Sequence, residues 1–293
     1  MSDQAGKVRN LMLFGLFAVF IGLIAIVLGL CYQEVQQWVY PVRIPIEPQP
    51  DDSPFSEVIL QTPDGLTIYG WYAPSETGQV ILLLHGLGSN RDHFMEHADD
   101  YMDAGYGLLS INFRNSGDSD GDVTSMGYHE INEARAAYDF LLAQDDVQQI
   151  VLMGHSMGAG IASQLMQEVD ADGLIMIAAF ADFYSIVRAG VVLRGFPPTP
   201  ITEILLTMAG SLSQADWYSL RPIDNLASVD KPMLLLHGTD DFTIPVDNAY
   251  RIVEANSQIK LVVIEGGGHA DLDVVAPDLY RTEIINYLDM VFN

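Results

Sequence analysis

Basic residues are scarce in this chain of 293 residues. Lysine and arginine together number 13 against 39 aspartates and glutamates, which gives a formal net charge of −26 at pH 7. Because binding to a phosphate backbone needs clustered positive charge, this balance argues against nucleic acids and anionic polymers as partners. A solvated acidic surface that keeps the protein soluble accounts for the charge without any specific acidic function.

Cysteine is almost absent, since Cys31 is the single one. No disulfide can form within the chain, and the redox compartment cannot be deduced from the sequence. Internal repeats and low-complexity tracts are missing as well. What is present is one long hydrophobic run near the N-terminus, followed by a stretch long enough to bury a sizeable core.

The hydrophobic run extends from Leu11 to Cys31 without a charge. As a helix it spans roughly 30 Å, so it predicts an uncleaved transmembrane signal anchor over residues 11–32. A cleaved signal peptide is the alternative, but the run is long for one and no small-x-small cleavage site follows it. Lys7 and Arg9 indicate that residues 1–10 are cytoplasmic and the bulk of the chain extracytoplasmic, although Arg43 lies on the other side.

A second segment, residues 33–54, is expected to be a proline-rich linker, extended from Val39 to Pro54. Its prolines prevent a regular helix and favour a semi-rigid spacer that holds the next domain away from the bilayer. They are Pro41, Pro45, Pro48, Pro50 and Pro54.

From residue 55 to 293 strand and helix patterns alternate, which predicts an α/β domain with a mostly parallel sheet and helices on both faces. Residues 55–60 and 66–73, joined by Thr62-Pro63-Asp64-Gly65, indicate a hairpin. Further strands are expected at 80–84, 108–113, 150–153, 174–178, 233–236 and 260–264. Helices are expected at 90–103, 131–144, after Ser156, at 246–255 and at 277–292. The proline-containing segment 182–229 breaks the rhythm and is interpreted as a helical cap, or else as one long connection.

The strand at 150–153 leads into Gly154-His155-Ser156-Met157-Gly158, and small residues then begin a helix. A sharp turn from strand to helix needs glycine where side chains would collide, and it lifts the central serine hydroxyl clear of the backbone. The helix N-terminus also favours the negative charge that develops when an ester carbonyl is attacked. This pattern makes Ser156 a candidate nucleophile.

A serine hydroxyl needs a general base and a third group that orients the base. Asp240 and Asp241 follow one late strand, and His269 follows the next. The carboxyl ends of parallel strands share one edge of a sheet, so these residues can converge on Ser156. Asp182, after an earlier strand, is a further candidate for the acid.

In these motifs the chain resembles the α/β-hydrolase superfamily over roughly residues 55 to 293. Within it, the chain resembles the membrane-anchored or secreted branch that includes the BEM46-like and ABHD13-like proteins and their bacterial relatives. The resemblance rests on five motifs in the expected order: His85-Gly86-Leu87-Gly88, Arg114 to Ser119, Gly154 to Gly158, His237 to Pro245, and Gly267-Gly268-His269. Arg114-Asn115-Ser116 departs from the Arg-Gly-x often found in relatives, which bears on the local loop shape.

The resemblance implies that Ser156 is the nucleophile, Asp241 the orienting acid and His269 the base. It also implies an oxyanion hole made by the backbone N–H groups of Leu87 and Met157. No cofactor or metal is implied.

Other histidines and aromatic residues have plainer interpretations. The glycine-associated His85, His155 and His237 are expected to make structural hydrogen bonds. His93 and His97, with Glu96 between them, have a metal-ligand spacing but lack a third ligand, so a solvated helix face is the preferred interpretation. Tyr184, Phe196 and Trp217 in the segment 182–229 fit either a cap core or a pocket lining.

These observations together predict a membrane-anchored serine hydrolase that cleaves carboxylic ester or thioester bonds through an acyl-enzyme. Its expected substrate is a small acyl ester, with a lipid-derived acyl chain as the hypothesis that the anchor suggests. An amidase or peptidase of the same fold is one alternative. A non-catalytic binding protein on a hydrolase fold is another.

Overall fold

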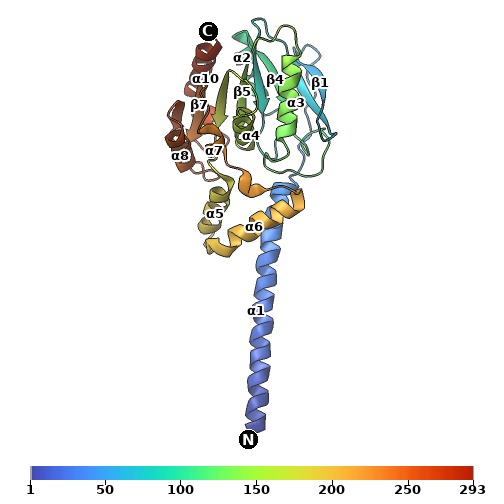
Figure 1. The fold of residues 1–293 in the computed structure, drawn as a ribbon, viewed down its shortest axis with the longest axis vertical. Helices are drawn as coiled ribbons and strands as arrows, with labels where there is room; N and C mark the ends of the chain where they lie inside the picture. The colour runs from blue at the N-terminus through green and yellow to red at the C-terminus, as the bar shows by residue number, and fades with distance from the viewer. Residues whose placement is uncertain (1, 293) are drawn as a thin grey trace.

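An eight-stranded sheet in the order β1-β2-β4-β3-β5-β6-β7-β8 forms the centre of the computed structural model, which describes residues 2–292 (Figure 1). β1 and β2 form the expected hairpin, and β2 pairs antiparallel with β4. The remaining neighbours all pair in parallel. The strands are β1 (Ser56–Gln61), β2 (Thr67–Ala73), β3 (Gln79–Leu84), β4 (Gly107–Ile111), β5 (Gln149–His155), β6 (Gly173–Ile177), β7 (Met233–Gly238) and β8 (Ile259–Ile264).

Each face of this sheet has its own hydrophobic core. Along β3, Val80, Leu82 and Leu84 belong to one core, whereas Ile81 and Leu83 belong to the other. This follows from the period of two of a strand whose two faces are both covered. The mostly parallel α/β sheet predicted from the sequence is confirmed.

Helices cover both faces. The first core includes α3 (Ile131–Leu142), α4 (Met157–Leu165) and α8 (Asp247–Ala255), and the second includes α2 (Ala98–Asp103) and α10 (Pro277–Phe292). A short helix, α9 (Leu272–Val275), follows β8. The carboxyl ends of the parallel strands therefore remain open at one edge, between the two helix layers.

The helix expected over residues 90–103 ends as expected but begins later than expected. A 3-10 turn, η1 (Met95–His97), precedes α2, and residues 91–94 form turns. Asn90 explains the difference, because its side-chain oxygen accepts the N–H of Asp92 and its amide donates toward the carbonyls of Ile44 and Pro45. An asparagine that bonds its own backbone in this way competes with helix formation.

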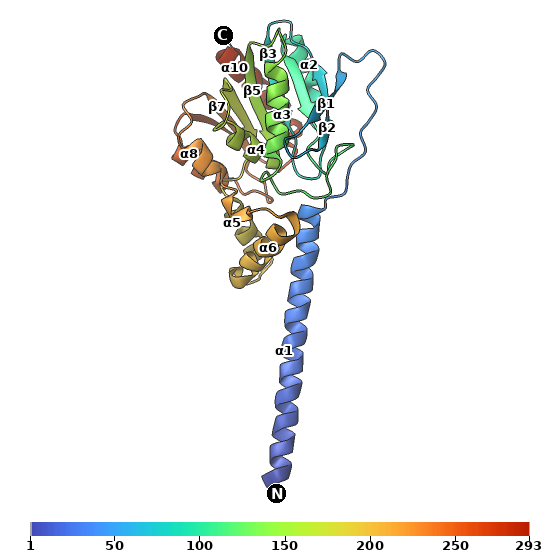
Figure 2. The same ribbon diagram turned by 45° about the vertical axis from the view of Figure 1, so that its right-hand side comes forward.

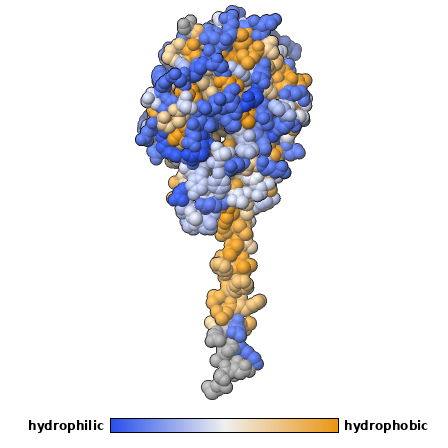
Figure 3. Space-filling view, in the orientation of Figure 1, coloured by the Kyte–Doolittle hydropathy of each residue, from blue (hydrophilic) through white to orange (hydrophobic). Residues whose placement is uncertain are grey.

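A single long helix, α1 (Ser2–Val39), projects from the domain and ends at the N-terminus far from it (Figure 1). Residues 10–39 are long and apolar enough to cross a membrane, judged by length and composition. Figure 3 shows this stretch as a hydrophobic stalk below a domain whose visible face is mainly hydrophilic.

α1 continues beyond residue 32 through Val39, because no proline occurs in the sequence before Pro41. Val35 and Val39 are fully buried and belong to the first core. The chain from residue 40 onward then lies along the domain, where the Arg43 guanidinium donates to the carbonyls of Ser119 and Gly121. The extended segment thus begins after Val39, as the prolines predict, and contacts the domain.

The segment between β6 and β7 forms α5 (Phe183–Leu193), α6 (Pro198–Ser213), a 3-10 turn η2 (Trp217–Ser219) and α7 (Pro222–Leu226). α5 and α6 lie at the end of the domain from which α1 projects, and α6 packs beside α1 (Figures 1 and 2). Trp217 is buried between Trp38 of α1 and Phe183 of α5. This inserted helical segment therefore packs directly against α1.

Candidate active site

Ser156 occupies the turn between β5 and α4. Its backbone has φ 54° and ψ −113°, a conformation that a non-glycine residue rarely adopts and that is found at strained functional positions. The N–H of Ser156 donates to the carbonyl of Ile177 on β6 at 2.9 Å, which holds the turn against the neighbouring strand. The side chain is consequently presented at the carboxyl edge of the sheet.

The two glycines that flank Ser156 have no room for a side chain. A Cβ at Gly154 would lie 2.3 Å from the carbonyl oxygen of Gly158, and a Cβ at Gly158 would lie 2.0 Å from the carbonyl oxygen of Leu84. Both contacts are with backbone atoms, which cannot move aside as a flexible side chain can. The glycines of the motif are therefore required by the close packing of strand, turn and helix.

The structure brings Ser156, His269 and Asp241 together in one chain of hydrogen bonds. His269 Nε2 lies 3.0 Å from Ser156 Oγ, and His269 Nδ1 lies 2.8 Å from Asp241 Oδ2. Because a carboxylate only accepts, Nδ1 carries the proton and Nε2 is left as the acceptor for the serine hydroxyl. Asp241 is buried, whereas the His269 side chain is 22% exposed and reaches the cavity described below.

Asp241 is held in place by further contacts. Its Oδ1 accepts the N–H groups of Thr243 at 2.9 Å and Ile244 at 2.7 Å. His237 Nε2 donates to the carbonyl of Ile244 at 2.7 Å, so this histidine makes the structural hydrogen bond expected of it. The orientation of the carboxylate is thus fixed by the loop that follows β7.

The other two acids considered from the sequence lie elsewhere. Asp240 is exposed, and its Oδ1 accepts from the Thr239 hydroxyl. Asp182 caps α5 by accepting the N–H of Ser185 and also pairs with Arg251. Hydrogen bonding to the ionised form, Arg251 included, holds the pKa of the Asp182 carboxyl below its usual range despite the opposing effect of burial. Of the three candidates, Asp241 is therefore the one in contact with His269.

Leu87 and Met157, the residues expected to form the oxyanion hole, flank the serine. Met157 follows it directly at the N-terminus of α4. Leu87 lines the same cavity, and a Cβ at the preceding Gly86 would lie 3.5 Å from Ser156 Cβ. Within residues 2–292, neither the Leu87 nor the Met157 N–H donates a hydrogen bond to another group. Both donors remain available at the serine.

The imidazole rings of His269, His155 and His93 pack in a row, called here the imidazole column, which no sequence motif indicates. The ring of His155 is 5.1 Å from that of His269, and the ring of His93 is 4.7 Å from that of His155. His155 Nε2 donates to the backbone carbonyl of His269 at 2.8 Å. Burial lowers the pKa of His155 to about 4 and that of His93 to about 3. Both rings are therefore neutral at pH 7.

His85 stabilises the loop that carries Leu87. Its Nδ1 donates to the carbonyl of Gly86 at 2.7 Å, and its Nε2 accepts the N–H of Phe113 at 3.1 Å. This pattern needs the neutral ring, and burial lowers the pKa of His85 to about 4. The expectation that His85 makes structural hydrogen bonds agrees with these contacts.

The solvated helix face proposed for His93 and His97 is wrong, because residues 91–94 are not helical and His93 packs in the imidazole column. His97 instead bonds Asp273 at 3.0 Å, and ligand atoms of Glu96, His97 and Asp273 lie within 4.8 Å of one another. We assign no metal to these three residues, since the hydrogen bond between His97 and Asp273 accounts for their arrangement.

Asn115 explains the departure from the Arg-Gly-x pattern. Its φ is 57°, in the left-handed region that glycine occupies freely and that asparagine tolerates best among other residues. The loop shape is therefore compatible with Asn115, and the side chain additionally accepts from Arg43.

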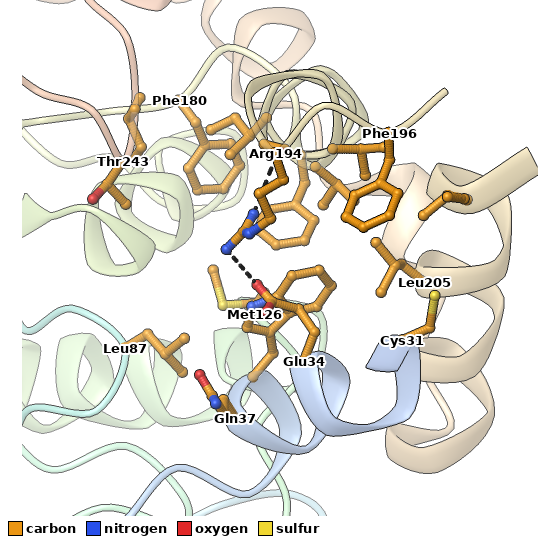
Figure 4. A pocket seen from close by; sticks show the side chains of 18 of the residues that line it. Cys31, Glu34, Gln37, Leu87, Met126, Phe180, Arg194, Phe196, Leu205 and Thr243 are labelled. Atoms are coloured by element: carbon orange, nitrogen blue, oxygen red, sulfur yellow. Dashed lines mark hydrogen bonds and ion pairs between the residues drawn. The ribbon is translucent and has the colours of Figure 1, made fainter. Parts of the chain in front are cut away.

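Ser156 and His269 both line a cavity of about 710 Å³. Its walls come from α1, α5, α6 and the loop after β7, and most of the lining side chains are apolar (Figure 4). Phe196 belongs to this lining, whereas Trp217 is buried in the helical packing and Tyr184 bonds Glu203. A mostly apolar cavity with a few convergent polar groups is the usual form of a small-molecule site.

Comparisons with known proteins agree with this architecture. Residues 81–281 match the model of the alpha/beta hydrolase family. The chain is also similar to an esterase structure, Pf2001 from Pyrococcus furiosus, with a TM-score of 0.71 and 23% identity, covering 87% of this chain and 100% of that one. At that identity the likeness concerns the fold.

The chain is also similar in sequence to an uncharacterized protein and to a lipase. An uncharacterized protein of Mycobacterium tuberculosis, Rv2307c, is 29% identical over 225 residues, which are 75% of this chain and 74% of that protein. Lysophosphatidylserine lipase ABHD12 of Xenopus tropicalis is 28% identical over 197 residues, 60% of this chain and 46% of the lipase. Membership of the BEM46-like and ABHD13-like branch stays a prediction.

Proposed function

Because the chain belongs to the alpha/beta hydrolase family, we propose that it is a serine hydrolase that cleaves carboxylic ester or thioester bonds through an acyl-enzyme on Ser156. The observation that carries the proposal is the continuous hydrogen-bonded chain from Ser156 Oγ through His269 to Asp241. It gives the hydroxyl a base with the correct tautomer and gives the base an orienting acid.

In the first step, Ser156 Oγ attacks the carbonyl carbon of the ester while His269 Nε2 takes the hydroxyl proton. The carbonyl oxygen becomes an oxyanion, which the free N–H groups of Leu87 and Met157 stabilise together with the N-terminus of α4. Asp241 stabilises the positive charge on the imidazolium. The tetrahedral intermediate then collapses, and His269 returns the proton to the departing alcohol or thiol.

In the second step, the oxygen of a water molecule attacks the carbonyl carbon of the acyl-enzyme while His269 Nε2 takes a proton from that water. Collapse of the second tetrahedral intermediate releases the carboxylic acid, and the proton on His269 restores the Ser156 hydroxyl. The reaction needs no group beyond these side chains and backbone donors.

The apolar walls of the cavity favour a substrate with a hydrocarbon acyl chain. Each buried methylene contributes about 0.8 kcal/mol, so a chain in this cavity adds substantially to binding. The esterase and lysophosphatidylserine lipase among the similar proteins are compatible with such a substrate.

Hydrolysis of matched substrates tests the proposal. We expect the full-length protein to hydrolyse p-nitrophenyl butyrate with a burst, and intact-mass measurement to reveal a butyryl adduct that is missing from Ser156→Ala. Preferential hydrolysis of the matching p-nitroanilide would favour the amidase alternative. Absence of both reactions in folded protein would favour a non-catalytic binding protein.

We propose further that α1 anchors the protein in a membrane, with residues 1–10 in the cytoplasm and the hydrolase domain outside it. The apolar stretch from residue 10 and the basic Lys7 and Arg9 before it support this orientation. Protease added to intact cells should therefore degrade the domain. Protection in intact cells, followed by cleavage after lysis, would contradict the orientation.

A further inference from the structure

The cavity at Ser156 is not enclosed by the hydrolase domain alone. One of its walls is a face of α1 formed by residues at helical spacing: Val27, Leu30, Cys31, Glu34 and Trp38. Between Val27 and Trp38 this wall extends along about 16 Å of the helix. The candidate membrane anchor is therefore also part of the substrate cavity.

The charges divide this wall into a polar part and an apolar part. No charged residue occurs in the sequence between Arg9 and Glu34, and Glu34 pairs with Arg194 of the α5 C-terminus at 3.0 Å. In Figure 4 this ion pair bridges the space between α1 and α5. Val27, Leu30 and Cys31 lie on the N-terminal side of the pair, inside the apolar stretch that is long enough to cross a bilayer.

The inserted helices lie on the same side. α5 and α6 lie at the end of the domain from which α1 projects, and α6 packs against both α1 and α5 (Figure 2). At the end of α5, Val192 is 52% exposed and Leu193 is 70% exposed, and Phe196 in the following loop is 44% exposed. An apolar cluster of this kind beside a membrane helix, next to an arginine, matches the composition of segments that rest in a membrane interface.

We propose that the enzyme takes its substrate directly from the bilayer that anchors it, and that the acyl chain lies against the α1 face at Val27, Leu30 and Cys31. The substrate class is an amphiphilic ester with a long hydrocarbon chain, whose polar end reaches Ser156 past the pair Glu34–Arg194. The acidic surface of the domain does not oppose this route, since the contact with the bilayer is made by apolar side chains. This inference rests on the ester hydrolase activity proposed above.

A bulky residue in the α1 wall tests the position of the acyl chain. The full-length protein is reconstituted in phosphatidylcholine liposomes, and hydrolysis of fluorogenic butyrate and palmitate esters is measured. Val27→Trp fills the cavity, whereas Ile26→Trp adds the same side chain at the adjacent position, which is 60% exposed and outside the lining. Each methylene excluded from the cavity lowers kcat/KM about fourfold, so we expect Val27→Trp to reduce palmitate hydrolysis at least about tenfold.

Ile26→Trp should hydrolyse both esters within about twofold of the wild type. In Val27→Trp the ratio of palmitate to butyrate hydrolysis should fall at least about tenfold, and an unchanged melting temperature shows that this variant is folded. If Val27→Trp impairs both esters, Leu30→Trp is measured in the same way. Equal palmitate hydrolysis by the wild type, Val27→Trp and Leu30→Trp would overturn the inference. A wild type that hydrolyses neither ester would instead refute the esterase activity itself.

Dilution of the substrate in the membrane tests the route. At a constant total amount of palmitate ester, added phosphatidylcholine should lower the rate if the ester enters from the same bilayer. Ester confined to separate liposomes should be hydrolysed far more slowly than ester in the enzyme's own liposomes. Entry from the bilayer would be contradicted if the rate depended only on the total ester concentration. The same holds if ester in separate liposomes were hydrolysed as fast as ester in the enzyme's own liposomes.

Discussion

Replacement of Asp241 by asparagine is the perturbation for which the structure gives the most specific expectation. Asp241 Oδ1 accepts hydrogen bonds from two backbone N–H groups, and Oδ2 accepts one from His269 Nδ1. All three partners are donors, so they require an acceptor at position 241. In the variant, an asparagine NH₂ group in the place of Oδ1 would face the two backbone N–H groups and be repelled by them. In the place of Oδ2 it donates to His269 Nδ1, which moves the imidazole proton to Nε2.

That tautomer has no lone pair for the Ser156 proton. The variant also loses the attraction between a buried carboxylate and the imidazolium that forms during attack. For charges about 4 Å apart at an effective dielectric constant near 20, this attraction is about 4 kcal/mol, or about a thousandfold in rate. We therefore expect Asp241→Asn to reduce kcat/KM for p-nitrophenyl butyrate by about a thousandfold or more.

Asp240→Asn is the matched control, because it makes the same chemical change at the adjacent, exposed residue. We expect it to retain at least about half of the activity, as is usual for a surface substitution. A variant Asp241→Asn that keeps more than a tenth of wild-type kcat/KM, with an unchanged melting temperature, would refute the assignment of Asp241 as the orienting acid.

Two further predictions concern stability. Gly158→Ala places a Cβ 2.0 Å from the Leu84 carbonyl oxygen, so we expect a loss of about 3 kcal/mol, seen by calorimetry as a melting temperature lower by about 10 °C. Gly29→Ala, which meets no atom within 4 Å, should not lower it; equal effects of the two changes would contradict the packing argument. His85 releases its proton more readily in the folded protein, with a pKa of about 4, than in the unfolded chain, where it is near 6.5. Its contribution to stability is therefore complete above pH 6.5 and falls by about 3 kcal/mol as the pH drops to 4, and thermal melts of His85→Gln should decline less over this range than those of the wild type. A decline as steep as that of the wild type would show that other groups dominate.

Much of the sheet could be predicted from sequence because its strands are continuous apolar runs bounded by turn residues. Val80 to Leu84 and Met233 to Leu236 are examples, and both are strands with both faces covered. Sequence patterns are less informative where side chains bond the backbone, as at Asn90, since such contacts depend on distant carbonyls that a local pattern does not contain.

The meeting of Ser156, Asp241 and His269 could be expected because motifs at the ends of parallel strands converge by topology. The imidazole column could not, because it requires the packing of His93 against His155 across separate segments. The contribution of α1 to the cavity could not be predicted either. The apolar spacing of Val35 and Val39 was a signal that the helix continues, but its packing partner, α6, lies far away in the chain.

Covalent labelling with a fluorophosphonate probe tests the central claim most directly. The full-length protein is compared with Ser156→Ala, with His269→Ala, and with Ser163→Ala as a control for a buried serine about two helix turns further along α4. We expect labelling of the wild type and Ser163→Ala only. Equal labelling of Ser156→Ala, or no labelling of folded wild-type protein, would contradict an activated serine at position 156.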